Sequence, residues 1–274
     1  PATTAPDAYC RPASRASRKP TDPASRFQTG SVRQAPGALP MIPWLGDHPV
    51  FPPASSALRK PNGLLAAGGS LAPDWLLAAY RQGIFPWFNQ GEPILWWSPD
   101  PRMVVIPNQV RITRSLGKTL KKGHYEVRLD HDFAAVIRAC AESRKSNVGT
   151  WITPAIEAAY IRMHELGYAH SVETWIDGEL AGGLYGMALG HVFYGESMFS
   201  RRTDASKIAF AHLARFLEQH DFRVLDCQMT TRHLASLGGR EIPREVFVKM
   251  LDTLTREGPP PARWPQDGAQ AAWT

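Results

Sequence analysis

The chain has 274 residues, 43% of them hydrophobic, which suits one large domain or two modest ones with a real core. No apolar run is long enough to span a bilayer and the N-terminus lacks a signal-peptide core, so a soluble protein is predicted. The net charge of +6 is weak support for nucleic-acid binding, because residues 1–40 carry six basic and only two acidic side chains.

The cysteines and the absence of familiar metal- and phosphate-binding motifs exclude several kinds of site. Cys10, Cys140 and Cys227 are odd in number and widely spaced, which argues against a disulfide framework or a structural zinc site and favours a reducing cytoplasm. His164 and His170 lack the i, i+4 histidine spacing of a zinc protease helix, and no phosphate-binding glycine loop is present. We expect no metal and no cofactor.

The N-terminal third divides into an extension and a small ordered region. Residues 1–40 are rich in Pro, Ala, Ser, Thr and Arg without apolar periodicity, which predicts disorder. Order is expected to begin near Met41. Ala72-Pro73-Asp74 opens a short helix through Tyr80, and Gly83 ends it.

An aromatic cluster follows, interrupted by prolines: Phe85, Trp87, Phe88, Trp96 and Trp97. From the residues alone two interpretations are open. The rings form a proline-stiffened core, or some of them form a stacking platform for unpaired nucleotides. The cluster ends at Pro99-Asp100-Pro101, a domain joint that bounds a small N-terminal domain at residues 41–100.

From Arg102 the pattern is that of mixed α and β structure. Strands are predicted at 103–106, 125–129, 171–176, 180–187 and 192–198, and helices at 132–142, 153–167, 204–219, 233–237 and 243–254. Thr153-Pro154 is a typical helix start, and Asp204 is expected to cap the next long helix. The tail at residues 258–274 is predicted to be loose.

Glycines inside one predicted strand mark an irregularity. Gly182, Gly183 and Gly186 do not form a dinucleotide-binding fingerprint, because they lie within the strand rather than in a loop before a helix. Glycine in a strand interior indicates a β-bulge or the close approach of a ligand.

Two carboxylates stand in apolar, strand-like segments. Glu196 lies among aromatic and thioether side chains in residues 193–200, and Asp226 follows Val224 and Leu225. A buried acid requires a function or a partner, so we predict that both line one pocket; pairing of Glu196 with a neighbouring Arg is the alternative. Strand alternation would place Asp226 and Gln228 on one face, about 7 Å apart.

Seven motifs occur in a fixed order between residues 41 and 257: PNGLLA (61–66), GIFPWF (83–88), LWWSPDPR (95–102), GTWIT (149–153), GESMFS (195–200), DCQ (226–228) and SLG (236–238). Together they resemble the leucyl/phenylalanyl-tRNA–protein transferase family. The resemblance implies an α+β fold, with a small N-terminal domain and a C-terminal domain at residues 101–257 that is similar to the GNAT (acetyltransferase) fold, a mixed sheet flanked by helices.

The resemblance also implies an activity and its partners. Members move Leu or Phe from aminoacyl-tRNA to the N-terminal Arg or Lys of an acceptor protein, forming a peptide bond that marks the acceptor for N-end-rule degradation. The ranking of Leu, Phe and Met is open. We expect no membrane partner and a monomer, because the small domain covers apolar surface.

The family's binding residues carry over by position. The aminoacyl pocket and the two residues beside it fall on Leu184, Phe193, Met198, Leu213, Leu225, Gly195 and Ser200. Leu at 184, 213 and 225 replaces Met, Phe or Ile of some members, which keeps the pocket apolar and is expected to shift the Leu-versus-Phe preference. Trp87 and Trp151 correspond to the tryptophans that hold the terminal adenosine of the tRNA. Trp96 and Trp97 are expected to be structural.

The chemistry sets modest demands on the catalytic residues. An aminoacyl ester is already activated, so the enzyme must bring an amine to it and stabilise the developing oxyanion. A free N-terminal amine has a pKa of about 7.7–8.0, so no strong base is required. We predict that Asp226 and Glu196 orient the acceptor's amine and basic first residue, assisted by Gln228. A proton relay and simple positioning are both open for Asp226 and Gln228.

Two other hypotheses are open. An acyl-CoA-dependent N-acetyltransferase of the same fold would carry an Arg-x-x-Gly-x-Gly/Ala loop, and residues 201–207 contain no glycine. We expect the basic side chains of this loop and the following helix N-terminus to be able to meet RNA phosphate instead. A non-catalytic aminoacyl-tRNA-binding module would have the same pocket and transfer nothing.

Overall fold

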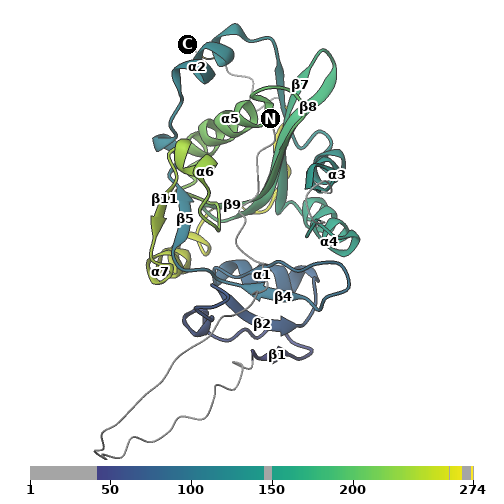
Figure 1. Cartoon of the computed structure of the whole chain (residues 1–274), viewed down its shortest axis with the longest axis vertical. Helices are drawn as coiled ribbons and strands as arrows, with labels where there is room; N and C mark the ends of the chain where they lie inside the picture. The colour runs from purple at the N-terminus through teal and green to yellow at the C-terminus, as the bar shows by residue number, and fades with distance from the viewer. Residues whose placement is uncertain (1–41, 145–149, 259, 267–272, 274) are drawn as a thin grey trace, which may run out of the picture. The chain divides into compact units, whose positions relative to one another are not determined.

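The computed structural model describes residues 42–144, 150–258, 260–266 and 273, so the extension predicted at residues 1–40 lies outside the described residues. From residue 42 on, helices and two β-sheets give the α+β class that the sequence predicts (Figure 1). Within the described part of the chain, no helix is both long enough and apolar enough to cross a membrane.

The first sheet has four short strands in the order β1 (Trp44–Leu45), β2 (Leu64–Gly68), β4 (Leu95–Trp97) and β3 (Phe85–Pro86). Helix α1 (Pro73–Arg81) adds its apolar side chains to the core of this sheet. The predicted helix limits are confirmed, because Pro73 occupies the first turn and Gly83, with φ 72°, ends the segment.

Trp96 lies in the centre of this first core. It is fully buried, its indole N–H donates a 2.9 Å hydrogen bond to a carbonyl in β2, and the rings of Phe51 and Trp75 flank it at centroid distances of 4.9 and 6.3 Å. Phe85 and Phe88 are buried as well. The core interpretation of the aromatic cluster is therefore confirmed for Trp96, Phe85 and Phe88.

The second sheet has seven strands in the order β11 (Arg240–Ile242), β5 (Arg102–Val105), β10 (Val224–Asp226), β9 (Val192–Ser200), β8 (Glu179–Leu189), β7 (Ala169–Ile176) and β6 (Glu126–Leu129). Strands β9 and β10 pair in parallel, and the other neighbours are antiparallel. The sheet is therefore mixed, as predicted.

Helices cover both faces of this sheet (Figure 1). Helices α2 (Arg114–Lys122) and α5 (Ala205–Gln219) pack on the face that carries Phe193 and Leu225, here called the α5 face. Helices α3 (Phe133–Arg144) and α4 (Pro154–Glu165) pack on the opposite face, which carries Tyr194 and Val224 and is called the α4 face. Helices α6 (Arg232–Ser236) and α7 (Arg244–Leu254) complete the chain's helical segments in the described region.

One cap prediction is confirmed and one is wrong. Thr153 caps α4, since its side-chain oxygen accepts a 3.3 Å hydrogen bond from the N–H of Ile156. Asp204 does not cap α5: its φ is 61°, and its carboxylate pairs with Lys207 at 2.8 Å instead. The side chain of Ser200 takes over, accepting the N–H of Ser206 at 3.3 Å.

A register shift interrupts the β8–β9 hairpin. Gly186 pairs with Gly195 and Tyr185 pairs with Ser197, which leaves Glu196 as the extra residue of a β-bulge in β9. The bulge indicated by the strand glycines is therefore confirmed at Gly186.

Side-chain alternation changes phase at this bulge. Tyr194 points to the α4 face, and Glu196 contacts residues of that same face, but Met198 packs with the α5-face cluster. Gly182 has a different reason to be glycine, because Ala205 at the start of α5 lies where a side chain would go. Its close neighbour is a helix of this chain.

Gly186→Ala tests the bulge. A β-carbon there would overlap the carbonyl oxygen of Tyr194 and lie 2.6 Å from the Phe193 ring, so we expect a loss of at least about 2 kcal/mol in the free energy of unfolding. Urea denaturation measures it. Gly117→Ala in α2 is the control: its β-carbon would meet only Ile112 at 3.7 Å, and we expect a gain of up to about 1 kcal/mol. Unchanged stability of Gly186→Ala would contradict the bulge geometry.

Candidate active site

Asp226, the last residue of β10, forms a buried ion pair. It pairs across the sheet with Val104 of β5, which puts it on the same face as Arg102, two residues earlier in that strand. The Arg102 guanidinium donates to both carboxylate oxygens, Nε to Oδ1 at 2.8 Å and Nη2 to Oδ2 at 2.6 Å, and neither side chain has exposed surface. Both oxygens of Asp226 are therefore already bound within the protein.

Arg102 also connects the two sheets. Its Nη1 donates a 3.0 Å hydrogen bond to the carbonyl of Gly83, just after α1, and its guanidinium carbon lies 5.1 Å from the ring centre of Phe85 and 4.7 Å from that of Phe247 in α7. Aromatic faces and carbonyl oxygens both suit a guanidinium that has left water. The cation thus has polar or π partners on several sides.

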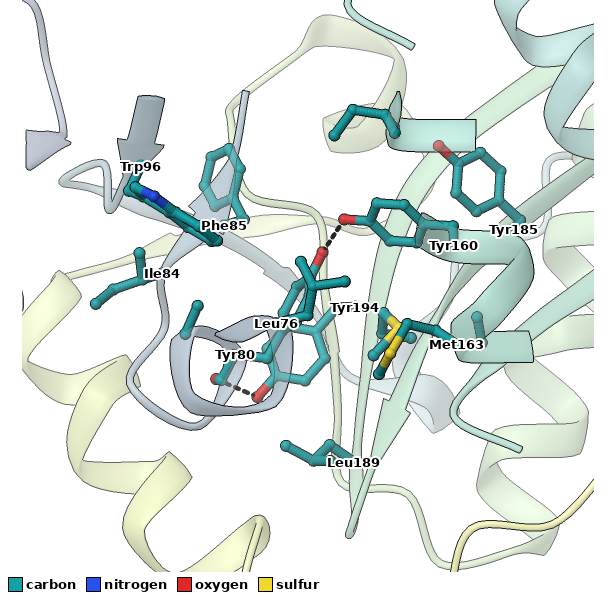
Figure 2. Close-up of a cluster of buried hydrophobic side chains, with 14 of the residues drawn as sticks. Leu76, Tyr80, Ile84, Phe85, Trp96, Tyr160, Met163, Tyr185, Leu189 and Tyr194 are labelled. Carbon is teal, nitrogen blue, oxygen red and sulfur yellow. Dashed lines mark hydrogen bonds between the residues drawn. The ribbon is translucent and has the colours of Figure 1, made fainter. Parts of the chain in front are cut away.

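Glu196 lies on the α4 face and is only partly buried. Oε1 accepts a 2.6 Å hydrogen bond from the Tyr80 hydroxyl, and Oε2 accepts one of 3.2 Å from the Tyr160 hydroxyl. The two hydroxyl oxygens, from α1 and α4, also lie within hydrogen-bonding distance of each other, and Figure 2 shows them pointing toward one another beside the core. With one proton each, the two hydroxyls can fill only two of these three contacts at a time while Glu196 is ionised. The side-chain amide of Gln228 reaches Oε1 at 3.4 Å.

Burial raises the pKa of Glu196 from its usual 4.5 to about 7, and the negative charge of Asp226 adds to the rise, while hydrogen bonds from Tyr80 and Tyr160 oppose it. Burial, and then the charge of Glu196, raise the pKa of both tyrosine hydroxyls well above 10. The two tyrosines therefore stay protonated and donate. Glu196 is poised between acid and carboxylate near neutral pH, a property that clusters at functional sites.

The two acids and Gln228 do come together, although not as strand alternation predicts. The expectation that Asp226 and Gln228 share a strand face is wrong, because β10 ends at Asp226 and Gln228 has φ 54°. The N–H of Gln228 folds back to donate to Asp226 Oδ1 at 3.0 Å. The predicted alternative of an arginine partner for Glu196 is also wrong among the described residues, where Arg102 pairs with Asp226.

The predicted aminoacyl pocket forms one cluster on the α5 face. Its buried members are Leu184, Phe193, Leu213 and Leu225. Met198 is half-buried against them and Gly195 is half-buried, whereas Ser200 is exposed and bonded to the first turn of α5. This cluster lies on the opposite face of the sheet from Glu196.

The two faces meet where β9 and β10 part. Their pairing stops at Tyr194 and Asp226, while β9 continues to Ser200, so the strands fork at this point. Gly195 lies at the fork, and a β-carbon on it would be 3.5 Å from the carbonyl oxygen of Asp226. The fork thus lies between the apolar cluster of the α5 face and Glu196 on the α4 face.

The predicted adenosine-binding tryptophans are both half-buried. Trp87 and Trp151 pack against the α4-face core and keep part of each ring exposed. The Trp87 ring meets Trp97 edge-on at 5.3 Å, and the Trp97 indole N–H donates to the Trp87 carbonyl at 2.7 Å, which supports a structural role for Trp97. Among the described residues, no aromatic ring contact joins Trp87 to Trp151.

Part of the tail expected to be loose packs on the α5-face cluster. The Trp264 ring lies 5.6 Å from that of Phe193 and stacks on His170 at a centroid distance of 4.1 Å, and the Trp264 backbone N–H donates to Asp130 at 2.9 Å. A cavity of about 250 Å³ adjoins the contact, and none of the predicted site residues lines it.

Sequence reasoning missed three residues of the site. Tyr160 lies unremarked within the helix predicted at 153–167, Tyr80 is named only as the end of a helix, and Arg102 only as the last residue of a motif and the start of the mixed α and β region. Both tyrosines occupy helix positions that suit the core but end in a hydroxyl group, and a buried hydroxyl usually has a hydrogen-bond partner. That requirement is the signal by which the sequence could have pointed to them.

Comparison with known proteins identifies the family. Residues 104–252 match the model of the leucyl/phenylalanyl-tRNA protein transferase family, and residues 69–100 match the model of its N-terminal domain. The chain belongs to the leucyl/phenylalanyl-tRNA–protein transferase family. It is an aminoacyltransferase with an aminoacyl-tRNA donor and a protein acceptor, and it combines the family's N-terminal domain with the domain matched by the main family model. The predicted bounds, 41–100 and 101–257, stay predictions.

Individual relatives agree. The transferase of Azoarcus sp. strain BH72 is 68% identical over 224 residues, covering 82% of this chain and 95% of that one. That of Aromatoleum aromaticum is 62% identical over 224 residues, with 82% and 94% covered. Among solved structures, a GCN5-related N-acetyltransferase from Kribbella flavida aligns over 62% of this transferase and 60% of its own chain, with a TM-score of 0.34 and 12% identity.

Glu196→Gln is expected to stabilise the transferase in a pH-dependent way. Because the pKa of Glu196 is higher in the folded protein than in the unfolded chain, its ionisation opposes folding as the pH rises from about 5 to about 8. We expect the variant to be about 2 kcal/mol more stable than wild type at pH 8 and nearly equal at pH 5. Urea denaturation at both pH values measures this. Exposed Glu218→Gln on α5 should show no such pH dependence. An equal effect at both pH values would contradict the raised pKa.

Proposed function

We propose that this transferase moves Leu or Phe from tRNA to acceptor proteins that begin with Arg or Lys, and so marks them for N-end-rule degradation. The observation that carries the proposal is Glu196, a partly buried carboxylate at the fork that two tyrosine hydroxyls and Gln228 hold in place. A fixed anion suits an acceptor whose first residue is cationic and whose terminus is an amine. We propose Met as a third amino acid that the enzyme can transfer.

The proposed reaction needs little beyond positioning. The neutral α-amine of the acceptor attacks the ester carbonyl, the new C–N bond forms, and the ester C–O bond to the terminal ribose breaks. The proton lost by the amine balances the one gained by the ribose oxygen. Glu196 binds the cationic end of the acceptor, and the Gln228 amide supplies a hydrogen bond near the reacting carbonyl.

We propose for Asp226 a different role from the one expected. Its oxygens are bound by Arg102 and it has no exposed surface, so it is not available to orient the incoming amine. We therefore propose Glu196 and Gln228 as the groups that contact the acceptor directly.

The donor is proposed to enter at the fork. Its aminoacyl side chain passes Gly195, which has no side chain to block the way, and reaches the apolar cluster of Leu184, Phe193, Met198, Leu213 and Leu225. Trp87 and Trp151 are proposed to hold the terminal adenosine, because each is anchored on the core and exposes part of its ring.

Helix α2 supports contact with the tRNA backbone. It buries Leu116 and Leu120 against the α5-face core. Four of its exposed side chains are basic, and a fifth exposed basic residue lies three positions before the helix. The five are Arg111, Arg114, Lys118, Lys121 and Lys122. Helix α2 has no acidic residue, and no ion pair within the described residues neutralises these cations. A row of unpaired cations suits a phosphate backbone.

We also propose a cytoplasmic monomer. The donor is aminoacyl-tRNA, and cysteine usage suits a reducing compartment. Two alternative functions, an acyl-CoA-dependent N-acetyltransferase and a non-catalytic aminoacyl-tRNA-binding module, can be distinguished by experiment. Acetyl-CoA binding in calorimetry would favour the acetyltransferase, and tight tRNA binding without turnover would favour the binding module.

The deciding assay supplies phenylalanyl-tRNA carrying labelled Phe and two peptides that differ only in an N-terminal Arg or Ala. We expect label to move to the Arg peptide alone, because Glu196 provides one anionic partner for that residue. Label on both peptides would contradict the acceptor rule. Label retained on the tRNA with both, while the complex forms, would contradict transfer.

Charge reversal on α2 tests the tRNA surface. Lys118→Glu/Lys121→Glu should weaken phenylalanyl-tRNA binding and reduce the slope of log K against log salt concentration by about 2, roughly one per lost phosphate contact. Filter binding between 50 and 200 mM salt, roughly the range used to measure such slopes, is the assay. Lys249→Glu on α7 is the matched control, an exposed lysine on another helix. The same slope in both variants would overturn the α2 assignment.

A further inference from the structure

The carboxylate of Asp226 holds more than Arg102. Oδ1 accepts both the Arg102 Nε–H at 2.8 Å and the backbone N–H of Gln228 at 3.0 Å, and Oδ2 accepts Arg102 Nη2–H at 2.6 Å. The residue is fully buried. Asp226 therefore joins a cation on β5 to the backbone of the residue whose amide reaches Glu196.

Gln228 needs this support because of its conformation. Its φ of 54° lies in the left-handed region. Residues other than glycine seldom adopt this backbone conformation unless surrounding contacts hold them in it. Two contacts do so here. Its carbonyl accepts the N–H of Met103 in β5 at 3.2 Å, and its N–H is bound by Asp226. The turn directs the side-chain amide toward Glu196 Oε1, 3.4 Å away.

Arg102 reaches the other side of Glu196 as well. Its Nη1 donates to the carbonyl of Gly83, three residues after Tyr80, whose hydroxyl donates to Glu196 at 2.6 Å. The rings of Phe85 and Phe247 enclose the guanidinium. One buried cation is thus bonded to the segment that carries Tyr80 and, through Asp226, to the turn that carries Gln228.

We propose that Arg102 is a positioning residue of the transfer reaction. Through Asp226 it fixes the left-handed turn at Gln228, and through Gly83 it fixes the end of α1, so that the Gln228 amide and the Tyr80 hydroxyl converge on Glu196. Asp226 acts through the backbone of Gln228 and takes no proton from the acceptor amine. The inference rests on the proposed roles of Glu196 and Gln228.

Single substitutions would confuse this role with folding, since either one leaves a buried charge without its partner. Two double variants avoid that. Arg102→Gln/Asp226→Asn removes both charges and keeps an oxygen to accept the Gln228 N–H. Arg102→Leu/Asp226→Leu also removes both charges and takes that acceptor away. Thermal melting of both variants checks that they are folded at the assay temperature.

Steady-state transfer of Phe from phenylalanyl-tRNA to an N-terminal Arg peptide gives the readout. We expect the Gln/Asn variant to retain kcat within about tenfold of wild type and the Leu/Leu variant to lose about a hundredfold, the usual effect of misplacing a group by about 1 Å. The KM for the tRNA should not change. Because Glu196 has a pKa of about 7 and must be ionised to bind a cationic acceptor, kcat/KM should rise with pH near 7, and this rise should persist in both variants.

A loss of kcat by about a thousandfold in the Gln/Asn variant, or loss of its pH dependence, would show that Asp226 acts as a base and overturn the inference. Equal kcat in the two double variants would also overturn it. If the Leu/Leu variant melts below the assay temperature, the Gln/Asn variant alone decides by the same criteria. Failure of the wild-type protein to transfer Phe would instead refute the proposed function.

Discussion

The buried pair of Arg102 and Asp226 is the interaction on which the rest of this structure depends. Each charge costs several kcal/mol to remove from water, and loss of either partner is typically worth about 3–5 kcal/mol. The pair is bonded to Gly83 and packed against Phe85 and Phe247, so one electrostatic unit links the first sheet, the second sheet and the last helix. The relative position of these parts is therefore set by charge satisfaction as well as by apolar packing.

Around this fixed pair the active site keeps one adjustable charge. Glu196 is held by neutral donors, the hydroxyls of Tyr80 and Tyr160 and the amide of Gln228, and none of them cancels its charge. Its ionisation is costly in the free protein. In the proposed reaction a cationic acceptor would remove that cost on binding, so we propose that the unpaired charge of Glu196 selects a positively charged ligand.

The sequence was sufficient for much of the fold, which depends on local pattern and residue type, and its ordered motifs were sufficient for the family. The predictions for α4, the three central hairpin strands and an acid in each of two apolar strands are confirmed. Contacts across long separations were not predictable: Arg102 and Asp226 are 124 residues apart, and no local pattern links them. Helix α2 was missed because Gly117 and its many cations hide a stripe of only two buried leucines.

The bulge explains another limit. A single extra residue at Glu196 inverts the alternation of β9, so strand period alone assigns Glu196 and Met198 to the same face when the structure puts them on opposite ones. Gln228 differs for a similar reason, since its left-handed turn ends the strand two residues early. The roles of individual residues depend on where a substrate binds, and the periodicity of the sequence carries no information about that.

The cation–π contact between Arg102 and Phe247 has a consequence for synthesis of the chain on the ribosome. Arg102 emerges long before Asp226 and Phe247, the residues that neutralise and enclose it. Until Asp226 and α7 have left the exit tunnel, the guanidinium lacks its counter-ion and one of its two aromatic neighbours. The ion pair and its full aromatic enclosure are therefore completed only when the chain is nearly finished, so an incomplete nascent chain lacks them.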